Sequence, residues 1–168
     1  MARGDNKAIT WVYEEYGPVL FTVCLRYGGS REEAEDLFQE GFLHILDKAG
    51  SYKGDSALRS WMYRVMCNYC ISALRKQNNK IKFNNLSDDE FLMADEEEPE
   101  VESKINQETL IELIQQLPAG YRLVLNMYAL ENKSHTEIAA ELGMSETTSR
   151  TQLFKARRML RKKMEELK

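Results

Sequence analysis

Between Ser134 and Met164, the types and spacing of the residues point to contact with DNA. From Ser145 onward, a helical period of 3.6 residues separates cations, hydroxyls and one aromatic from small and apolar side chains. The outward set is Thr147, Arg150, Thr151, Phe154, Lys155 and Arg158, and the inward set is Ser149, Leu153, Ala156, Leu160 and Met164. A solvated surface helix explains the charges but leaves Phe154 in water. A helix in the major groove explains both, because Phe can contact a thymine methyl while Arg and Lys reach bases or phosphates.

The residues before this helix predict the turn that would position it. Ser134 and Glu137 have the spacing of a capping box, which marks the start of a first short helix. Gly143 supplies a turn, and Ser145 caps a second helix that we expect to reach about Lys163. Ile138, Ala139 and Leu142 give the first helix one apolar edge. The segment therefore predicts a helix-turn-helix.

Composition limits the class of protein. The chain has 168 residues, 43% of them hydrophobic, and a formal net charge of -4, so attraction to DNA requires a local basic patch. Basic residues cluster at 150–163 and again at 75–82, and acidic residues cluster at 88–102. We find no apolar run that would span a bilayer and no signal-peptide core, and three cysteines give no disulfide framework. These features predict a cytoplasmic protein without membrane insertion.

Helical periodicity predicts an all-α fold of two small domains. The expected divisions are a helical domain at 1–78, a flexible acidic linker at 79–104 and a helix-turn-helix domain at 105–168. In the first domain, Gly17–Pro18 is expected to separate two helical stripes, and Ser30 with Glu33 forms another capping box. A later helix opening at Ser56 is expected to bury Leu58, Trp61, Met62, Val65 and Tyr69. The linker contains an acidic, Pro-containing run that is too polar to order itself.

Residues 36–45 interleave polar and apolar side chains on one predicted helix. Asp36, Gln39, Glu40 and Leu43 share one flank, and Leu37, Phe38, Gly41 and Ile45 share the other. On periodicity alone, the segment is an amphipathic helix with a solvated outer face.

Four segments together resemble the bacterial extracytoplasmic-function sigma factors of the sigma-70 superfamily. Residues 36–45 resemble the helix that binds core RNA polymerase, and residues 52–64 resemble the promoter-melting segment. Residues 68–76 resemble the −10 recognition helix, and residues 137–157 resemble the −35 reader. The four segments occur in the family order and cover nearly the whole chain. The resemblance implies a factor that binds core polymerase and directs promoter-specific initiation.

The resemblance also implies which residues carry each contact. For core polymerase these are Asp36, Leu37, Gln39, Glu40 and Leu43. For −10 DNA they are Lys53, Asp55, Ser56, Ala57, Arg59, Trp61, Arg64, Asn68, Ser72, Arg75 and Lys76. For −35 DNA they are Thr147, Thr148, Arg150, Thr151, Gln152, Phe154, Lys155, Arg157 and Arg158. Ser72 stands where the family commonly has Asp, and Gln152 where it often has a basic residue, so the preferred promoter is expected to differ.

The implied partners are core polymerase, through its β′ clamp helices and β flap, promoter DNA, and an anti-sigma factor or another recruiting protein. Residue chemistry fits the −10 role independently. The polar loop after residue 52 precedes a helix N-terminus and suits the rim of a pocket for a base extruded from the stack. For Trp61, a place in the core remains the alternative. The acidic linker either threads near the nascent RNA path, as in similar proteins, or is a solvated spacer.

Cys67 and Cys70 have C-x-x-C spacing, but zinc needs four ligands and a redox motif needs a preceding strand, so both are expected to be packing residues. No catalytic constellation, metal site or cofactor site stands out, which predicts that the chain is not an enzyme. A stand-alone transcriptional regulator and a protein-binding helical adaptor remain the alternative functions.

Overall fold

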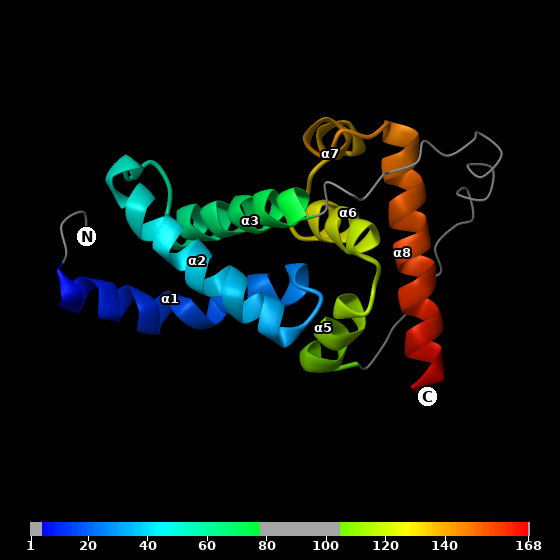
Figure 1. The fold of residues 1–168 in the computed structure, drawn as a ribbon, viewed down its shortest axis with the longest axis horizontal. Helices are drawn as coiled ribbons and strands as arrows, with labels where there is room; N and C mark the ends of the chain where they lie inside the picture. Colours follow the sequence, from blue (N-terminus) through cyan, green and yellow to red (C-terminus); the bar gives the residue numbers. More distant parts are fainter. Residues whose placement is uncertain (1–4, 78–104, 168) are drawn as a thin grey trace. The chain divides into compact units, whose positions relative to one another are not determined.

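The computed structural model describes residues 5–77 and 105–167, and the chain divides into two compact units, Met1–Gln77 and Asn78–Lys168. Every regular element in these described ranges is a helix, which confirms the all-α prediction (Figure 1). The predicted linker at 79–104 lies outside the described residues. No helix in the part of the chain that the structure describes is long and apolar enough to cross a membrane.

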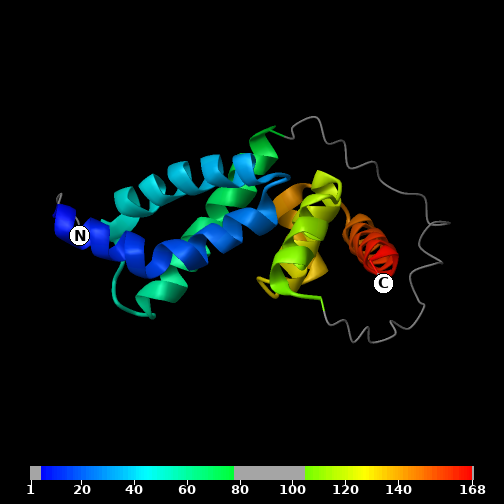
Figure 2. The same ribbon diagram turned by 90° about the horizontal axis from the view of Figure 1, so that it is seen from below.

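The first unit is a bundle of three helices in which each helix packs against the other two (Figure 2). They are α1 (Asn6–Tyr27), α2 (Arg31–Lys48) and α3 (Leu58–Gln77), and a short 3₁₀ turn, η1 (Ala49–Ser51), follows α2. The α2 start is as predicted: the Ser30 hydroxyl accepts from the Glu33 amide at 3.1 Å, and the Glu33 carboxylate accepts from the Gly29 amide at 2.7 Å. The helix therefore begins where the capping pattern indicated.

Two expectations for this unit were wrong. Pro18 does not separate two helices, because α1 runs through it, and packing along both neighbours outweighs the missing amide donor. The buried stripe of α3 is also shifted from the predicted one. Met62 is buried as expected, but Leu58, Trp61, Val65 and Tyr69 are only partly buried. The core residues of α3 are Met62, Met66, Cys67, Cys70, Ile71 and Leu74.

The C-x-x-C cysteines lie in this core. Cys67 and Cys70 are buried, and the Cys70 Sγ lies 3.9 Å from the Sγ of Cys24 on α1. Across the described residues, no group of three or more His, Cys, Asp or Glu side chains is arranged to hold a metal ion. Both cysteines are thus core residues of α3, and Cys70 packs against α1.

The second unit packs its last and longest helix against the other three. These are α5 (Gln107–Gln115), α6 (Ala119–Ala129), α7 (His135–Leu142) and α8 (Glu146–Glu166). A buried cation joins the first two: one nitrogen of the Arg122 guanidinium donates to the carbonyls of Leu117 at 2.8 Å and Gln115 at 3.2 Å. Because the last carbonyls of a helix have no partner inside it, Arg122 satisfies groups that burial would otherwise leave unpaired.

Candidate nucleic-acid interface and polymerase-docking surface

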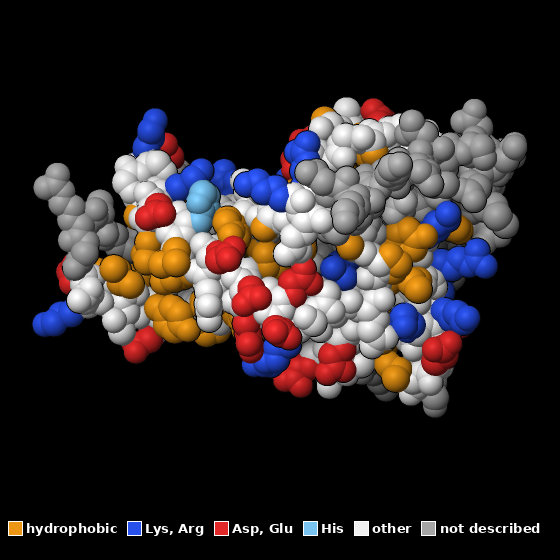
Figure 3. Space-filling view, in the orientation of Figure 1, with side chains coloured by type: hydrophobic (Ala, Val, Ile, Leu, Met, Phe, Trp, Pro, Cys, Tyr) orange, Lys and Arg blue, Asp and Glu red, His pale blue; other side chains and the backbone are white. Residues whose placement is uncertain are grey.

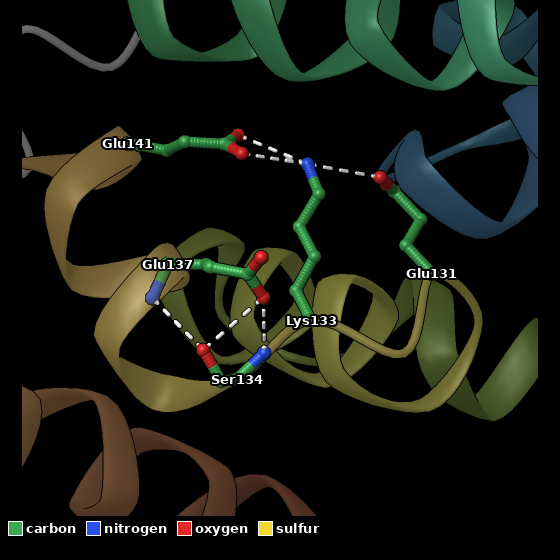
Figure 4. Close-up of polar contacts among 5 residues, drawn as sticks. All are labelled: Glu131, Lys133, Ser134, Glu137 and Glu141. Atoms are coloured by element: carbon green, nitrogen blue, oxygen red, sulfur yellow. Dashed lines mark hydrogen bonds and ion pairs between the residues drawn. The ribbon is translucent and has the colours of Figure 1, made fainter.

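The helix-turn-helix is fixed at its entry by a complete capping box (Figure 4). The Ser134 hydroxyl accepts from the Glu137 amide at 3.2 Å, and the Glu137 carboxylate accepts from the Ser134 amide at 2.8 Å. The carboxylate accepts a second bond from the Ser134 hydroxyl at 3.1 Å, and the bonds from the Ser134 amide and hydroxyl hold the pKa of Glu137 below its usual value. Next to the cap, the Lys133 ammonium donates to the carboxylate of Glu141 at 2.8 Å and lies 3.0 Å from that of Glu131. Lys133 thus ties the residues before α7 to the end of that helix.

The turn between α7 and α8 has the chemistry that the sequence predicted. Gly143 adopts φ 68°, a left-handed conformation that glycine takes without strain, and its amide donates to the Ala139 carbonyl. Ser145 caps α8, with its hydroxyl accepting from the Thr148 amide at 3.1 Å. The two helices of the motif are therefore joined by a turn whose geometry is set locally.

The outer side of α8 carries the basic residues that the sequence placed there (Figure 3). Arg150 and Arg158 are exposed, and Thr147, Gln152, Phe154, Lys155 and Arg157 are partly exposed. Arg150 lies 3.7 Å from Glu146, one turn before it, which is a weak surface pairing. The side-chain oxygen of Gln152 is enclosed and has no hydrogen-bond partner within the described residues, so reading a base requires its amide to turn outward.

Two of the residues expected to contact −35 DNA do not lie on this outer side. Thr151 is 3% exposed and donates from its hydroxyl to the Thr147 carbonyl at 3.0 Å, and Thr148 is fully buried. The predicted outward placement of Thr151 was wrong, because α8 packs against both α6 and α7 and its buried side is wider than one apolar stripe. Thr148, which the resemblance implied as a −35 contact, lies on the same buried side.

A stack of side chains supports the outer side of α8, and sequence reasoning missed it. The rings of Tyr128 and His135 are stacked with centroids 4.9 Å apart, and the guanidinium of Arg157 lies 5.4 Å from the Tyr128 centroid. On the other side, His135 Nδ1 shares a hydrogen bond of 2.8 Å with the Ser149 hydroxyl. Burial, followed by the charges of Arg150 and Arg157, lowers the pKa of His135. The stack joins α6, α7 and α8 beneath a cationic surface.

On the first unit, the outer side of α2 exposes four of the five residues expected to meet polymerase. Asp36, Gln39, Glu40 and Leu43 are exposed, and Leu43 keeps 63% of its surface in water. Leu37 is only 4% exposed, so its placement on a contact surface was wrong, and it belongs to the core. Glu40 accepts a hydrogen bond from the Tyr69 hydroxyl of α3 at 2.7 Å.

An apolar groove adjoins this side of α2. It has a volume of about 720 Å³ and lies between α1 and α2. Its lining includes the aromatic residues Tyr13, Phe21, Phe38 and Phe42, with Leu43 and with polar side chains such as Glu14, Arg31 and Gln39 at the same groove. Tyr13 packs edge-on against Phe42 yet is 52% exposed, and hydrophobic side chains gather on the same face (Figure 3). The sequence analysis did not indicate this groove, because α1 and α2 form it together.

The segment between η1 and α3 forms an exposed loop. Lys53, Gly54, Asp55 and Ala57 are exposed, and Gly54 adopts φ 78°. The loop is anchored at its ends, because the Tyr52 hydroxyl donates to the Ser56 carbonyl and the Tyr52 ring lies 5.4 Å from that of Trp61. Trp61 is therefore half-buried against the loop and does not lie in the bundle core.

Polar and cationic residues continue from this loop along α3. Arg64, Asn68, Ser72 and Lys76 recur every fourth residue and are exposed, as are Arg59 and Arg75. Because residues four apart lie on one side of a helix, the first four form a continuous polar stripe. The Arg64 guanidinium also lies 3.5 Å from the Ser56 hydroxyl, which links the stripe to the loop.

One unit of the chain is a capped helix-turn-helix with a basic outer side, and the other is a helical bundle with a polar stripe and an apolar groove, which together define an all-α DNA-binding protein. Residues 12–80 match the family model of sigma-70 region 2, and residues 107–160 match that of sigma-70 region 4. Together the two matches cover most of the chain, which belongs to the sigma-70 family of RNA polymerase sigma factors and, within it, to the extracytoplasmic-function group. It directs promoter-specific transcription initiation with core RNA polymerase.

Relatives along the whole chain agree with this placement. The chain is 27% identical to the RNA polymerase sigma-H factor of Pseudomonas aeruginosa, over 98% of this chain and 90% of the relative. It is also 27% identical to the ECF RNA polymerase sigma factor SigW of Bacillus subtilis, over 98% and 93%. A solved structure of the sigma factor RpoE, in complex with the anti-sigma factor NepR from Bartonella quintana, shares the fold at TM-score 0.50 and 19% identity, over 93% of this chain and 96% of that one.

Proposed function

We propose that the two units divide the promoter between them. Residues 1–78 bind core polymerase and recognise and melt the −10 element, residues 105–168 read the −35 element, and residues 79–104 connect them. The observation that carries this division is the pair of separate basic surfaces, one along α8 and one along α3. Since each unit folds around its own helical core, one factor can hold two promoter elements at once.

For the −35 element, α8 enters the major groove with Arg150, Phe154, Lys155 and Arg158 toward the bases, and Arg157 toward backbone phosphate. Two features support this assignment. The turn at Gly143 sets the direction in which α8 leaves α7, and the Tyr128 ring lies beneath the Arg157 guanidinium. Because Thr148 and Thr151 are buried, they act by shaping the first turns of α8.

For the −10 element, the loop at 53–57 takes a base extruded from the duplex, and the α3 stripe follows the unpaired strand. Taking one base out of the stack costs a few kcal/mol, so the loop must repay that cost with contacts. Exposed backbone groups around Gly54 and the cations Arg59 and Arg64 suit this task. Asn68, Ser72, Arg75 and Lys76 extend the same surface.

For polymerase, Asp36, Gln39, Glu40 and Leu43 meet the β′ clamp helices, while the second unit approaches the β flap. Exposure of Leu43 beside an aromatic groove supports docking, because a large apolar side chain in water favours burial by a partner. An anti-sigma factor or another recruiting protein is the expected regulator. The chain acts in the cytoplasm and performs no chemistry itself, since polymerase makes the RNA.

The residues proposed to dock on polymerase can be tested by a binding experiment with core polymerase. Gln39→Ala with Glu40→Ala is expected to weaken binding to core polymerase, because both side chains are exposed on α2. The double variant also loses the Tyr69 hydrogen bond to Glu40, so a small drop in thermal stability is expected, and Tyr69→Phe measures that drop by itself. The matched control is Lys7→Ala, which removes an exposed side chain from the first turn of α1. Normal polymerase binding by the double variant would remove these residues from the docking surface.

The experiment that tests the whole proposal is multi-round transcription by bacterial core polymerase on a library of −35 and −10 promoter variants, with and without this protein. Transcripts that depend on both elements, and that disappear when either unit is deleted, would support the division. Specific binding to duplex DNA without polymerase, and no transcripts, would favour the stand-alone regulator. The absence of any salt-dependent DNA affinity would favour the protein-binding adaptor.

A further inference from the structure

The loop proposed to hold the −10 base is closed by a tyrosine that does not itself belong to its exposed surface. Tyr52 follows η1 directly and is half-buried. Its hydroxyl donates a hydrogen bond to the carbonyl of Ser56, four residues later, so one side chain joins the two ends of the loop. The loop runs between α2 and α3 (Figure 1).

Neighbouring side chains hold Tyr52 in place. The Trp61 ring, from the first turn of α3, lies 5.4 Å from the Tyr52 ring at an interplanar angle of 47°. The amide of Trp61 donates to the carbonyl of Ala57 at 3.1 Å, so the same residue also fixes the start of the helix. Arg64 approaches the Ser56 hydroxyl at 3.5 Å from the next turn. The loop is therefore tied to the helix by its Ser56 end and by the Tyr52 ring.

Between these ties, the loop backbone has few constraints of its own. Gly54 takes φ 78°, an added side chain there would meet no atom within 4 Å, and Lys53, Asp55 and Ala57 are exposed. Fixing one flexible residue costs roughly 1–2 kcal/mol of conformational entropy. A loop that is already closed avoids part of this cost when a base enters, which raises the affinity for the base without a new contact.

We propose that Tyr52 is a positioning residue for promoter melting: through the Ser56 carbonyl, its hydroxyl holds the 53–57 loop in the shape that accepts the extruded −10 base. This inference rests on the proposed function of that loop. In this proposal Tyr52 acts on the loop and not on DNA directly. Its phenolic oxygen makes the hydrogen bond to the Ser56 carbonyl that joins the two ends of the loop.

The variant that tests it is Tyr52→Phe, because the ring stays against Trp61 and only the hydroxyl is lost. Tyr16→Phe is the matched control, since Tyr16 lies on α1, far from the loop in the sequence, and packs its ring against Trp11. Both variants are assembled with core polymerase. Thermal unfolding and polymerase affinity are measured first. Polymerase affinity is expected to equal the wild-type value, and the free energy of unfolding is expected to fall by no more than the contribution of one hydrogen bond.

The deciding measurement is binding of each holoenzyme to a single-stranded −10 oligonucleotide, with the sequence that the promoter library returns. A second oligonucleotide is abasic at the position of the extruded base. Tyr52→Phe is expected to weaken binding to the first oligonucleotide roughly three- to tenfold, the range for loss of one hydrogen bond. Binding to the abasic oligonucleotide stays unchanged, so the ratio between the two affinities falls.

Each other outcome contradicts a different statement. If Tyr52→Phe keeps the wild-type ratio, or weakens binding to both oligonucleotides equally, Tyr52 does not position the loop for the base. If the wild-type holoenzyme itself binds both oligonucleotides equally, the loop does not capture a base, and the proposed role of residues 53–57 fails together with this inference. If Tyr16→Phe lowers the ratio as much, the effect does not come from the loop closure.

Discussion

Tyr69 on α3 and Glu40 on α2 are joined by a hydrogen bond of 2.7 Å from the phenolic hydroxyl to the carboxylate. Burial, together with this bond and the negative charge of Glu40, raises the pKa of Tyr69 to about 12. His44 packs against the same ring, with centroids 5.3 Å apart. An exposed carboxylate proposed to meet polymerase is therefore held in one orientation by the neighbouring helix.

The first prediction concerns this pair in alkaline solution. Because the folded state raises the pKa of Tyr69 above its usual value of 10.0, the stabilisation is complete below pH 10 and is lost as the pH rises toward about 12. A titration of tyrosinate absorbance should show a late-ionising group that is missing in Tyr69→Phe. Glu40→Gln should bring that group back toward the usual range. An unchanged late group in Glu40→Gln would mean that burial alone sets the pKa.

A second prediction follows from the close approach of α2 and α3 at Gly41. A side chain on Gly41 would place its Cβ 2.5 Å from the Met66 sulfur and 3.1 Å from the Tyr69 ring, and Met66 is fully buried. Overpacking of this kind costs about 1–3 kcal/mol, although the better helix propensity of alanine returns about 1 kcal/mol. Gly41→Ala should lower the free energy of unfolding in urea, and Gly41→Val should lower it further.

Gly50 is the control for this prediction, because an added Cβ there would meet no atom within 4 Å. Gly50→Ala should leave the urea midpoint nearly unchanged. In the double variant of Gly41→Ala with Met66→Ala, the loss should be smaller than the sum of the two single losses, since the clash is gone. If the two losses of unfolding free energy are additive, contact with the Met66 side chain is not the reason that a larger residue at position 41 destabilises the protein.

Short-range chemistry explains which features were predictable from the sequence. A capping box needs only Ser134, Glu137 and the helix between them, and the turn needs only a residue that accepts positive φ, as Gly143 does. Likewise, the charges of Arg150 and Arg158 face outward, because moving a charge out of water is costly. Each of these predictions was confirmed.

The errors arose where tertiary packing decides between two similar choices. On α3, Leu58 and Val65 start one apolar stripe, Met66 and Ile71 belong to another, and contact with both α1 and α2 selects the second. Thr151 followed the helical period outward, but its hydroxyl can bond its own backbone, so burial leaves it satisfied. No signal within one helix separates these alternatives, because the deciding neighbours lie elsewhere in the sequence.

A third prediction concerns His135 under the outer side of α8. Burial and the facing cations Arg150 and Arg157 lower its pKa from 6.5, whereas Glu146 opposes them. The contribution to stability is therefore complete above pH 6.5 and is lost as the pH falls through the lowered value. His135→Phe keeps a ring against Tyr128 and cannot ionise.

NMR titration tests this directly, because the chain has two histidines and His44→Gln assigns the remaining signal to His135. That signal should titrate below 6.5. The unfolding free energy of His135→Phe should also fall less than that of the wild type between about pH 7 and pH 5. A His135 signal that titrates above 6.5 would mean that the ring is stabilised as a cation, and the stack would need a different account.

The last prediction concerns Arg150, which is exposed near the start of α8 and pairs only weakly with Glu146. Since that surface pair contributes little to stability, Arg150→Ala should leave thermal unfolding unchanged. If Arg150 makes a good base contact, the variant holoenzyme should bind its promoter about 1–3 kcal/mol more weakly and discriminate less at one −35 position. Arg150→Lys should recover the charge but not the forked geometry, so affinity should return more than discrimination.

Lys7→Ala, which removes an exposed cation from α1, is the control and should change neither promoter affinity nor discrimination. Equal losses on all −35 sequences, with a smaller salt dependence, would instead assign Arg150 to a phosphate.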